Sequence, residues 1–208
     1  MRYLVTNDDG IGARGLWAVV RALREVGEVV VVAPDREQSG VGASFSLHHP
    51  VRVHRINRRG VKAHAVEGTP ADAVLLALGH LYPEGIDAVV SGVNPGSNMG
   101  RDIFLSGTVG AALHGHFKGI PSVAISMSRL KRPRYSTGAF VARALVPLIA
   151  ANDSFKETIL NVTVPNFKPE DLQGVEITRL MDAHSNLEVT AGDNGRHSHY
   201  WIGIERRK

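Results

Sequence analysis

Short apolar segments and longer amphipathic segments alternate along the first 165 residues of this 208-residue chain. Apolar runs typical of buried parallel strands occupy residues 3–6, 29–33, 87–91, 122–126 and 159–164. Between them, apolar residues at helical spacing, with capping or stop residues at the ends, predict helices over residues 16–26, 70–81, 108–118 and 137–150. Strands separated by helices in this way predict right-handed crossovers, and therefore an α/β fold with a mostly parallel sheet and helices on both faces.

Three segments depart from this alternation. Residues 34–49 are rich in Gly and Ser without a clear period, and a loop of this length inside a compact domain is usually functional. Residues 51–56 and 61–66 flank a turn and predict a hairpin. From Val175 onward the sequence changes to strand-like alternation. We therefore predict an α/β core over residues 1–165 and a β-rich C-terminal addition over residues 166–208.

Composition narrows the classes of protein that the chain can belong to. The chain has no cysteine, which excludes disulfides, thiolate metal sites and a cysteine nucleophile. It has no apolar run long enough to span a bilayer and no basic-then-apolar leader, so we expect a cytoplasmic protein without membrane contact. The formal net charge of +4 suits anionic substrates, whereas the basic residues are dispersed without interleaved aromatics, so we expect no specific nucleic-acid partner.

The first strand ends in two adjacent carboxylates, Asp8 and Asp9, followed by Gly10. In open α/β sheets, ligands bind outside the carboxyl ends of the strands. Two neighbouring carboxylates repel each other unless they are protonated, hydrogen-bonded or bridged by a cation, and Mg²⁺ or Mn²⁺ is the natural bridge. A helix-capping turn is the alternative explanation, because Asp and Asn favour caps and Gly favours turns.

Two further strands lead into segments with neutral oxygen ligands. Ser39 follows the second strand, and Asn94 and Asn98 follow the strand at residues 87–91. Parallel strands bring these three side chains to the same sheet edge as Asp8 and Asp9, where hydroxyl and amide oxygens could complete a metal site. Taken singly, each of the three is better explained by ordinary turn chemistry, and it is their coincidence at one sheet edge that favours the metal site.

Ser106, Gly107 and Thr108 precede a helix and offer hydroxyls and exposed amides to an anion. A helix cap by Ser106 or Thr108 is compatible with this role. A metal and a phosphate site on one edge together indicate phosphoryl chemistry. The sequence lacks the P-loop, the dinucleotide-binding fingerprint and the nucleophile elbow, so the functions that depend on these motifs are unsupported.

Five ordered motifs resemble the survival protein SurE family of nucleotidases. They are N-D-D-G (Asn7–Gly10), A-P-D-R-x-x-S-G (Ala33–Gly40), E-G-T-P-A-D (Glu67–Asp72), V-S-G-V-N-x-G-x-N-x-G (Val90–Gly100) and S-G-T-V-G-A-A (Ser106–Ala112). The resemblance covers residues 1–165 in the right order, and it implies a divalent-metal-dependent phosphatase that hydrolyses nucleoside 5′-monophosphates. It also implies some activity on 3′-nucleotides and short polyphosphate.

The resemblance further implies a site and an assembly. Carried over by motif, one divalent cation, Mg²⁺ or Mn²⁺, would be held by Asp8, Asp9, Ser39 and Asn94, and the phosphate would be surrounded by Asn98, Ser106, Gly107 and Thr108. It implies a homodimer or homotetramer, although this chain stops soon after Tyr200 and Trp201, where family chains usually continue into further strands.

The resulting hypothesis is metal-dependent attack of water on a phosphate monoester, with Asp8, in preference to Asp9, as the acceptor of the water's proton. The hydroxyls of Ser106 and Thr108 and the helix amides would stabilise charge on the phosphoryl oxygens. The alternative is a non-catalytic nucleotide-binding module with the same phosphate site. The paired carboxylates favour the enzyme, because phosphate binding alone gains nothing from nearby anions without a metal.

Overall fold

The computed structural model describes residues 1–58, 60–128, 131–183, 185–193, 195 and 198–204. The strands are β1 (Arg2–Thr6), β2 (Glu28–Pro34), β3 (Val53–Arg58), β4 (Val61–Val66), β5 (Ala88–Pro95), β6 (Ser122–Met127), β7 (Ile159–Val164), β8 (Leu187–Asp193) and β9 (Ser198–Ile204). The α-helices are α1 (Arg14–Leu23), α2 (Pro70–Leu76), α3 (Gly107–Phe117) and α4 (Tyr135–Ala150), and α2 continues into a π-helical turn, η1 (Ala77–Leu81). Short 3₁₀ turns are η2 (Gly100–Phe104), η3 (Asp153–Glu157) and η4 (Pro169–Asp171).

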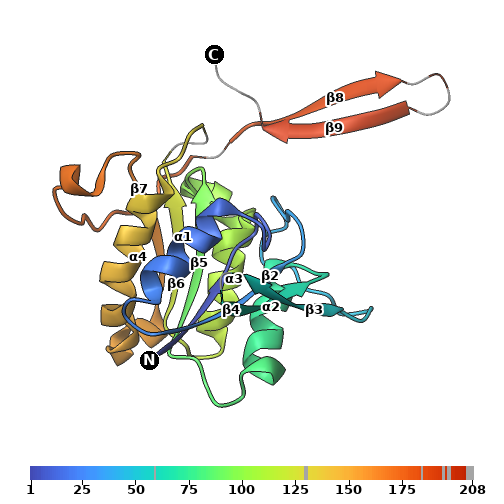
Figure 1. The fold of residues 1–208 in the computed structure, drawn as a ribbon. Coiled ribbons are helices and arrows are strands. Elements are labelled where there is room, and N and C mark those ends of the chain that lie inside the picture. The colour runs from blue at the N-terminus through green and yellow to red at the C-terminus, as the bar shows by residue number, and fades with distance from the viewer. Residues whose placement is uncertain (59, 129–130, 184, 194, 196–197, 205–208) are drawn as a thin grey trace.

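The centre of the molecule is a seven-stranded sheet in the order β3-β4-β2-β1-β5-β6-β7 (Figure 1). β3 pairs antiparallel with β4, as the predicted hairpin requires, and the other neighbouring strands of this sheet are parallel. The predicted α/β fold with a mostly parallel sheet is therefore confirmed. β1 lies between β2 and β5, and the strand order reverses at this point of the sheet. In such sheets, ligands usually bind beside the carboxyl ends of the strands at the point of reversal, which here is the end of β1.

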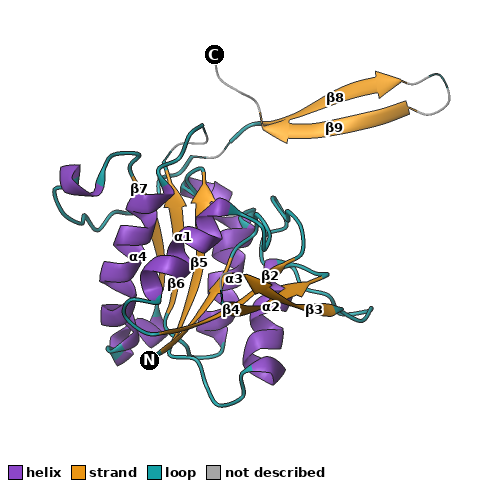
Figure 2. Cartoon of the chain, viewed as in Figure 1, coloured by secondary structure: helices purple, strands orange, loops and turns teal. Residues whose placement is uncertain are grey.

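Helices cover both faces of this sheet (Figure 2). α1 and α4 pack on one face, where Leu16 and Val146 join Tyr3 of β1 in the larger apolar core. α2 and α3 pack on the other face, where Val74 joins Leu4 of the same strand in a second core. Successive residues of β1 thus point to opposite cores, which is why its sequence is apolar without alternation.

The helix and strand boundaries differ from the sequence predictions in several places, and β3, predicted over residues 51–56, spans Val53–Arg58. α1 ends at Leu23, where the amide of Val26 already turns back to the Leu23 carbonyl at 3.0 Å. α4 begins at Tyr135, two residues early, and η1 widens the end of the predicted helix over residues 70–81. β5 continues past residue 91 to Pro95, so that Asn94 belongs to the last part of the strand.

A two-stranded antiparallel sheet, β8–β9, extends away from the main sheet at the C-terminal end of the chain (Figure 1). The predicted β addition is present, but residues 172–183 and 185–186 form no strand, so it begins later than the sequence pattern indicates. Trp201 of β9 is 70% exposed. Among the described helices, none has both the length and the apolar character needed to cross a membrane.

Candidate active site

Asp8 is the central side chain at the carboxyl end of β1, and it is only 4% exposed. The hydroxyl of Thr108 donates to Asp8 Oδ1 at 2.7 Å, and the backbone amide of Thr108 donates to Asp8 Oδ2 at 3.1 Å. Thr108 lies in the first turn of α3, one hundred residues further along the chain. The two hydrogen bonds fix the carboxylate against the start of the helix that was predicted to bind phosphate.

This close approach depends on Gly107, the first residue of α3. A Cβ atom at position 107 would lie 2.8 Å from the Cβ of Asp8 and 3.2 Å from Asp8 Oδ2. Real Cβ atoms do not come so close to a neighbouring side chain, so only glycine permits α3 to begin here. Gly107, predicted from the motif to contact phosphate, therefore also has a packing role beside Asp8.

The loop after β2 is fastened to the same place. The amide of Gln38 donates to the backbone carbonyl of Asp8 at 2.7 Å, and the amide of Ile11 donates to the Pro34 carbonyl at 2.7 Å. At the tip of this loop, the exposed hydroxyl of Ser39 donates to Glu37 Oε1 at 2.8 Å. The structure thus places the loop that carries Ser39 against the end of β1, as the sheet-edge argument predicts.

Asn94 and Asn98 lie at and just beyond the end of β5. Asn94 Nδ2 donates to the carbonyl of Gly96 at 2.8 Å, which engages the nitrogen of this amide and leaves its oxygen as the atom suited to bind a metal. Asn98 is buried, and its Nδ2 donates to Ser126 Oγ at 2.9 Å. Asn98 is thereby tied to the neighbouring strand β6.

Ser106 caps α3. Its hydroxyl accepts a hydrogen bond from the amide of Val109 at 3.2 Å, so the cap that the sequence suggested is present. The hydroxyl and amide of Thr108 are both engaged with Asp8. For Ser106, Gly107, Thr108 and Asn98, contact with phosphate stays a prediction, and the structure adds that each also holds a neighbouring element in place.

The chain resembles known proteins over almost its whole length. The family model described as Survival protein SurE matches residues 3–186. The chain belongs to the SurE family. It is 42% identical over 206 residues to "5'-nucleotidase SurE" of Dehalococcoides mccartyi strain CBDB1, covering 97% of this chain and 78% of that protein.

A second SurE protein and a solved structure agree with this assignment. The "5'-nucleotidase SurE" of Vibrio cholerae serotype O1 (El Tor Inaba N16961) is 40% identical over 205 residues, covering 98% of this chain and 80% of that protein. The crystal structure of the Sure protein from Aquifex aeolicus superposes with a TM-score of 0.83 at 36% identity, covering 99% of this chain and 83% of that chain. The SurE-like fold is therefore confirmed together with the family.

In this SurE-family chain, the two aspartates are difficult to ionise together. The pKa of Asp9 is raised to about 7, mainly by burial and in addition by the charges of Asp8 and Glu37. Burial also raises the pKa of Asp8, against the opposing effect of the hydrogen bonds from Thr108. A divalent cation between these carboxylates would favour both charged forms, so the donor set fits such an ion.

The chemistry of the donors also limits the kind of metal. Within the described part of the chain, no group of three or more His, Cys, Asp or Glu side chains lies together that could hold a metal ion by itself. A cation at Asp8 and Asp9 would therefore need neutral oxygens, such as those of Ser39 and Asn94, to complete its shell. Such an all-oxygen set suits Mg²⁺ or Mn²⁺ better than zinc, which prefers nitrogen and sulfur.

The sequence prediction missed two residues near these aspartates. Glu37 accepts a hydrogen bond from Ser39 and acts electrostatically on both aspartates. Glu37 stands at a position that the second SurE motif leaves open, so only its closeness to Ser39 in the sequence could have marked it. Tyr135, at the start of α4, lies close enough to Asp9 for that charge, after burial, to raise the pKa of the phenol. No local pattern marks Tyr135, because only the packing of α4 brings it here.

The raised pKa of Asp9 predicts how the metal-free protein responds to pH. Between about pH 4, where an unfolded aspartate ionises, and about pH 7, the folded protein retains a proton that the unfolded chain has released. Unfolding therefore releases a proton, and we expect the melting temperature of chelated protein to fall as pH rises through this range. Thermal melts of the chelated protein at pH 5 and pH 8 measure this change in melting temperature.

Asp9→Asn is the control for this prediction, because an amide stays neutral at every pH. The variant should melt at a higher temperature than the chelated wild type at pH 8 and should show a smaller difference between the two pH values. Equal pH dependence of wild type and variant would show that Asp9 does not titrate in this range.

Proposed function

We propose that this chain is a divalent-metal-dependent phosphatase that hydrolyses nucleoside 5′-monophosphates to nucleoside and phosphate, with 3′-nucleotides and short polyphosphate as further substrates. The hydrogen-bonded contact between Asp8 and Thr108 is the observation that carries this proposal, because it joins the carboxylate pair to the helix start suited to phosphate. The SurE proteins of Dehalococcoides mccartyi and Vibrio cholerae, both named 5′-nucleotidases, support the choice of substrate.

We assign the metal to Asp8, Asp9, Ser39 and Asn94, with Mg²⁺ or Mn²⁺ as the ion. When bound, such a cation polarises a phosphoryl oxygen and makes a bound water more acidic. Asp8 contributes a carboxylate whose orientation is already set by Thr108. Ser39 comes from the loop that is fastened to β1, so its approach to the aspartates requires no refolding of the core.

The remaining residues would orient the substrate and move the proton. The N-terminal end of α3, formed by Ser106, Gly107 and Thr108, would attract the phosphate through its dipole and the Ser106 hydroxyl, and Asn98 would add an amide. Thr108, whose two donors are engaged with Asp8, would set the position of that carboxylate beside the phosphate. Of the two aspartates, we assign the proton of the attacking water to Asp8, whose carboxylate Thr108 holds in a fixed orientation. Burial raises the pKa of Asp8 against the opposing effect of these hydrogen bonds, and a raised pKa favours acceptance of a proton.

Release of inorganic phosphate from a panel of nucleotides, measured after chelation and again with Mg²⁺ or Mn²⁺ added, tests the function. We expect turnover of 5′-monophosphates only with metal, and less turnover of 3′-nucleotides and polyphosphate. Nucleotide binding without phosphate release would instead support a non-catalytic binding module. Tight binding of long DNA or RNA near physiological salt would contradict a small-molecule substrate, since the basic residues are dispersed.

The proposal extends to the assembly and its location. We propose a homodimer or homotetramer, and the exposed apolar side chains of the β8–β9 hairpin, such as Val189, Trp201 and Ile202, support it because large exposed apolar patches usually mark interfaces. The mass of the protein in solution checks this. We place the protein in the cytoplasm, where a chain without cysteine is at no disadvantage.

A further inference from the structure

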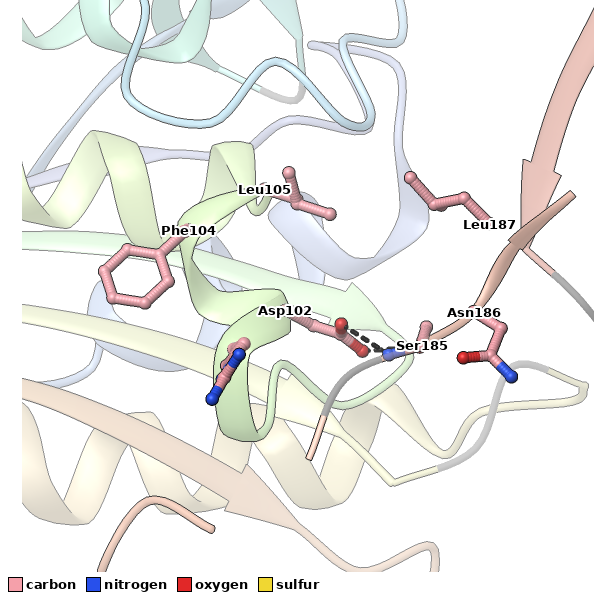
Figure 3. Close-up of a pocket in the computed structure, with 7 residues that line it drawn as sticks. Asp102, Phe104, Leu105, Ser185, Asn186 and Leu187 are labelled. Carbon is pink, nitrogen blue, oxygen red and sulfur yellow. Dashed lines mark hydrogen bonds between the residues drawn. The ribbon is translucent and has the colours of Figure 1, made fainter. Parts of the chain in front are cut away.

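A cavity of about 650 Å³ opens between η2 and residues 185–187 (Figure 3). Its volume lies within the range of small-molecule sites, which is about 300–1,000 Å³. Leu105 reaches into this space from one side and Leu187 from the other, above the contact between Asp102 and Ser185 (Figure 3). The cavity therefore has walls from two segments that are about eighty residues apart in the sequence.

The two walls are held together by hydrogen bonds. Asp102 accepts from the Ser185 amide at 2.8 Å and from the Ser185 hydroxyl at 2.5 Å. The amide of Arg101 donates to the carbonyl of Ala183 at 2.8 Å, and the same carbonyl fills the space that a Cβ at Gly100 would need. The segment before β8 is thus hydrogen-bonded to η2 at two successive residues, Arg101 and Asp102, and packs closely against Gly100, so both walls of the cavity are held in place.

The cavity adjoins the proposed phosphate site. η2 ends at Phe104, and one further residue, Leu105, separates it from Ser106 at the cap of α3. Consecutive Cα atoms are about 3.8 Å apart, so the cavity wall at Leu105 lies directly beside Ser106, the first residue of the proposed phosphate site. The carbonyl of Leu105 is also bound by the amide of Gly42, which holds this residue in place at 3.1 Å.

The walls expose apolar and aromatic surface. Phe104 is 75% exposed and Leu187 is 59% exposed, and both line the same cavity, where exposed apolar side chains gathered together can contact a ligand. Arg101 and Asp102 place charged groups at the same cavity. A ligand bound here would contact apolar side chains and charged ones, and its end nearest Ser106 would lie beside the proposed phosphate site.

We infer that this cavity binds the nucleoside part of the substrate, with Phe104, Leu105 and Leu187 contacting the base and sugar. The inference rests on the proposed phosphatase function. Apolar and stacking contacts recognise the face of a base, which all bases share, whereas hydrogen bonds to the edges distinguish one base from another. The cavity therefore selects nucleotides over base-free phosphate esters more strongly than it selects among the bases.

The test compares adenosine 5′-monophosphate with ribose 5-phosphate, which has the same phosphate ester and no base. In the metal-loaded protein, Phe104→Ala and Leu187→Ala should each lower kcat/KM for adenosine 5′-monophosphate by about tenfold, the loss expected for one base–side-chain contact. The value for ribose 5-phosphate should stay unchanged. Leu148→Ala is the matched control, because Leu148 is 65% exposed on α4 and does not line the cavity.

The outcomes separate this inference from the function on which it rests. If wild-type protein with metal releases phosphate from neither substrate, the proposed phosphatase function fails. If the wild type hydrolyses the nucleotide and the two cavity variants match it on both substrates, the nucleoside site is wrong. Equal losses on both substrates would also overturn the nucleoside site, because they would show that these side chains only position the residues that bind phosphate.

Discussion

Asp9→Asn is expected to lower the rate of phosphate release by about 1,000-fold while the protein stays folded. A divalent cation contributes several kcal/mol to the stabilisation of a phosphoryl transition state, and each 1.36 kcal/mol corresponds to about a tenfold change in rate. An amide at position 9 keeps the shape of the side chain but removes half of the carboxylate pair that would hold the ion. Steady-state phosphate release at saturating Mn²⁺ measures the effect.

Calorimetric titration with Mn²⁺ accompanies this measurement and should show weaker binding for Asp9→Asn than for the wild type. Asp35→Asn serves as the control, because Asp35 is an exposed aspartate in the loop that carries Ser39. This variant should retain both activity and metal binding. Wild-type activity in Asp9→Asn, with no added requirement for metal, would show that the metal is not bound where we assign it.

Gly107→Ala is expected to reduce activity by at least about 100-fold, the cost that a displacement of about 1 Å can impose on a catalytic arrangement. The added methyl group would lie 2.8 Å from the Cβ of Asp8, so either the aspartate or the start of α3 must move. Such a movement breaks or lengthens the hydrogen bonds from Thr108 to Asp8. Phosphate-release kinetics together with a thermal melt separate lost activity from lost folding.

The matched control for this substitution is Gly79→Ala. Gly79 lies in η1, and a Cβ added there meets no atom within 4 Å, so this variant should keep wild-type activity. If Gly107→Ala were as active as Gly79→Ala, the close contact between α3 and Asp8 would have no part in catalysis.

The layers of the fold follow from the sequence because they depend on local patterns. The amphipathic spacing of α1 indicates a helix buried along one face, and the continuous apolar run of β2 indicates a strand buried on both faces. A strand buried on both faces is typical of a parallel sheet covered by helices on each side. Element boundaries follow less directly, because they depend on pairing between strands. The extension of β5 to Pro95 depends on pairing with β6, whose register shifts between Gly92 and Asn94, and no pattern in β5 itself indicates that shift.

The candidate site was predicted in outline for a similar reason. Asp8, Asp9 and the loop with Ser39 follow strands, and parallel strands deliver the residues that follow them to one edge. The sequence did not predict which distant residues act on these side chains. Through packing of the β2 loop and of α4, Glu37 raises the pKa of Asp9 and Asp9 raises that of Tyr135, and neither Glu37 nor Tyr135 belongs to a pattern with a functional meaning of its own.

The sequence by itself determined the α/β architecture, the family resemblance and the strand ends at which polar residues gather, because local periodicity and short motifs encode these. Only the tertiary structure decided that Thr108 holds Asp8, that Asp9 is buried enough to raise its pKa to about 7, and that Asp102 holds Ser185. These contacts join residues from separate parts of the chain. They depend on strand order and helix placement, which are set by the packing of the whole core and not by any single segment.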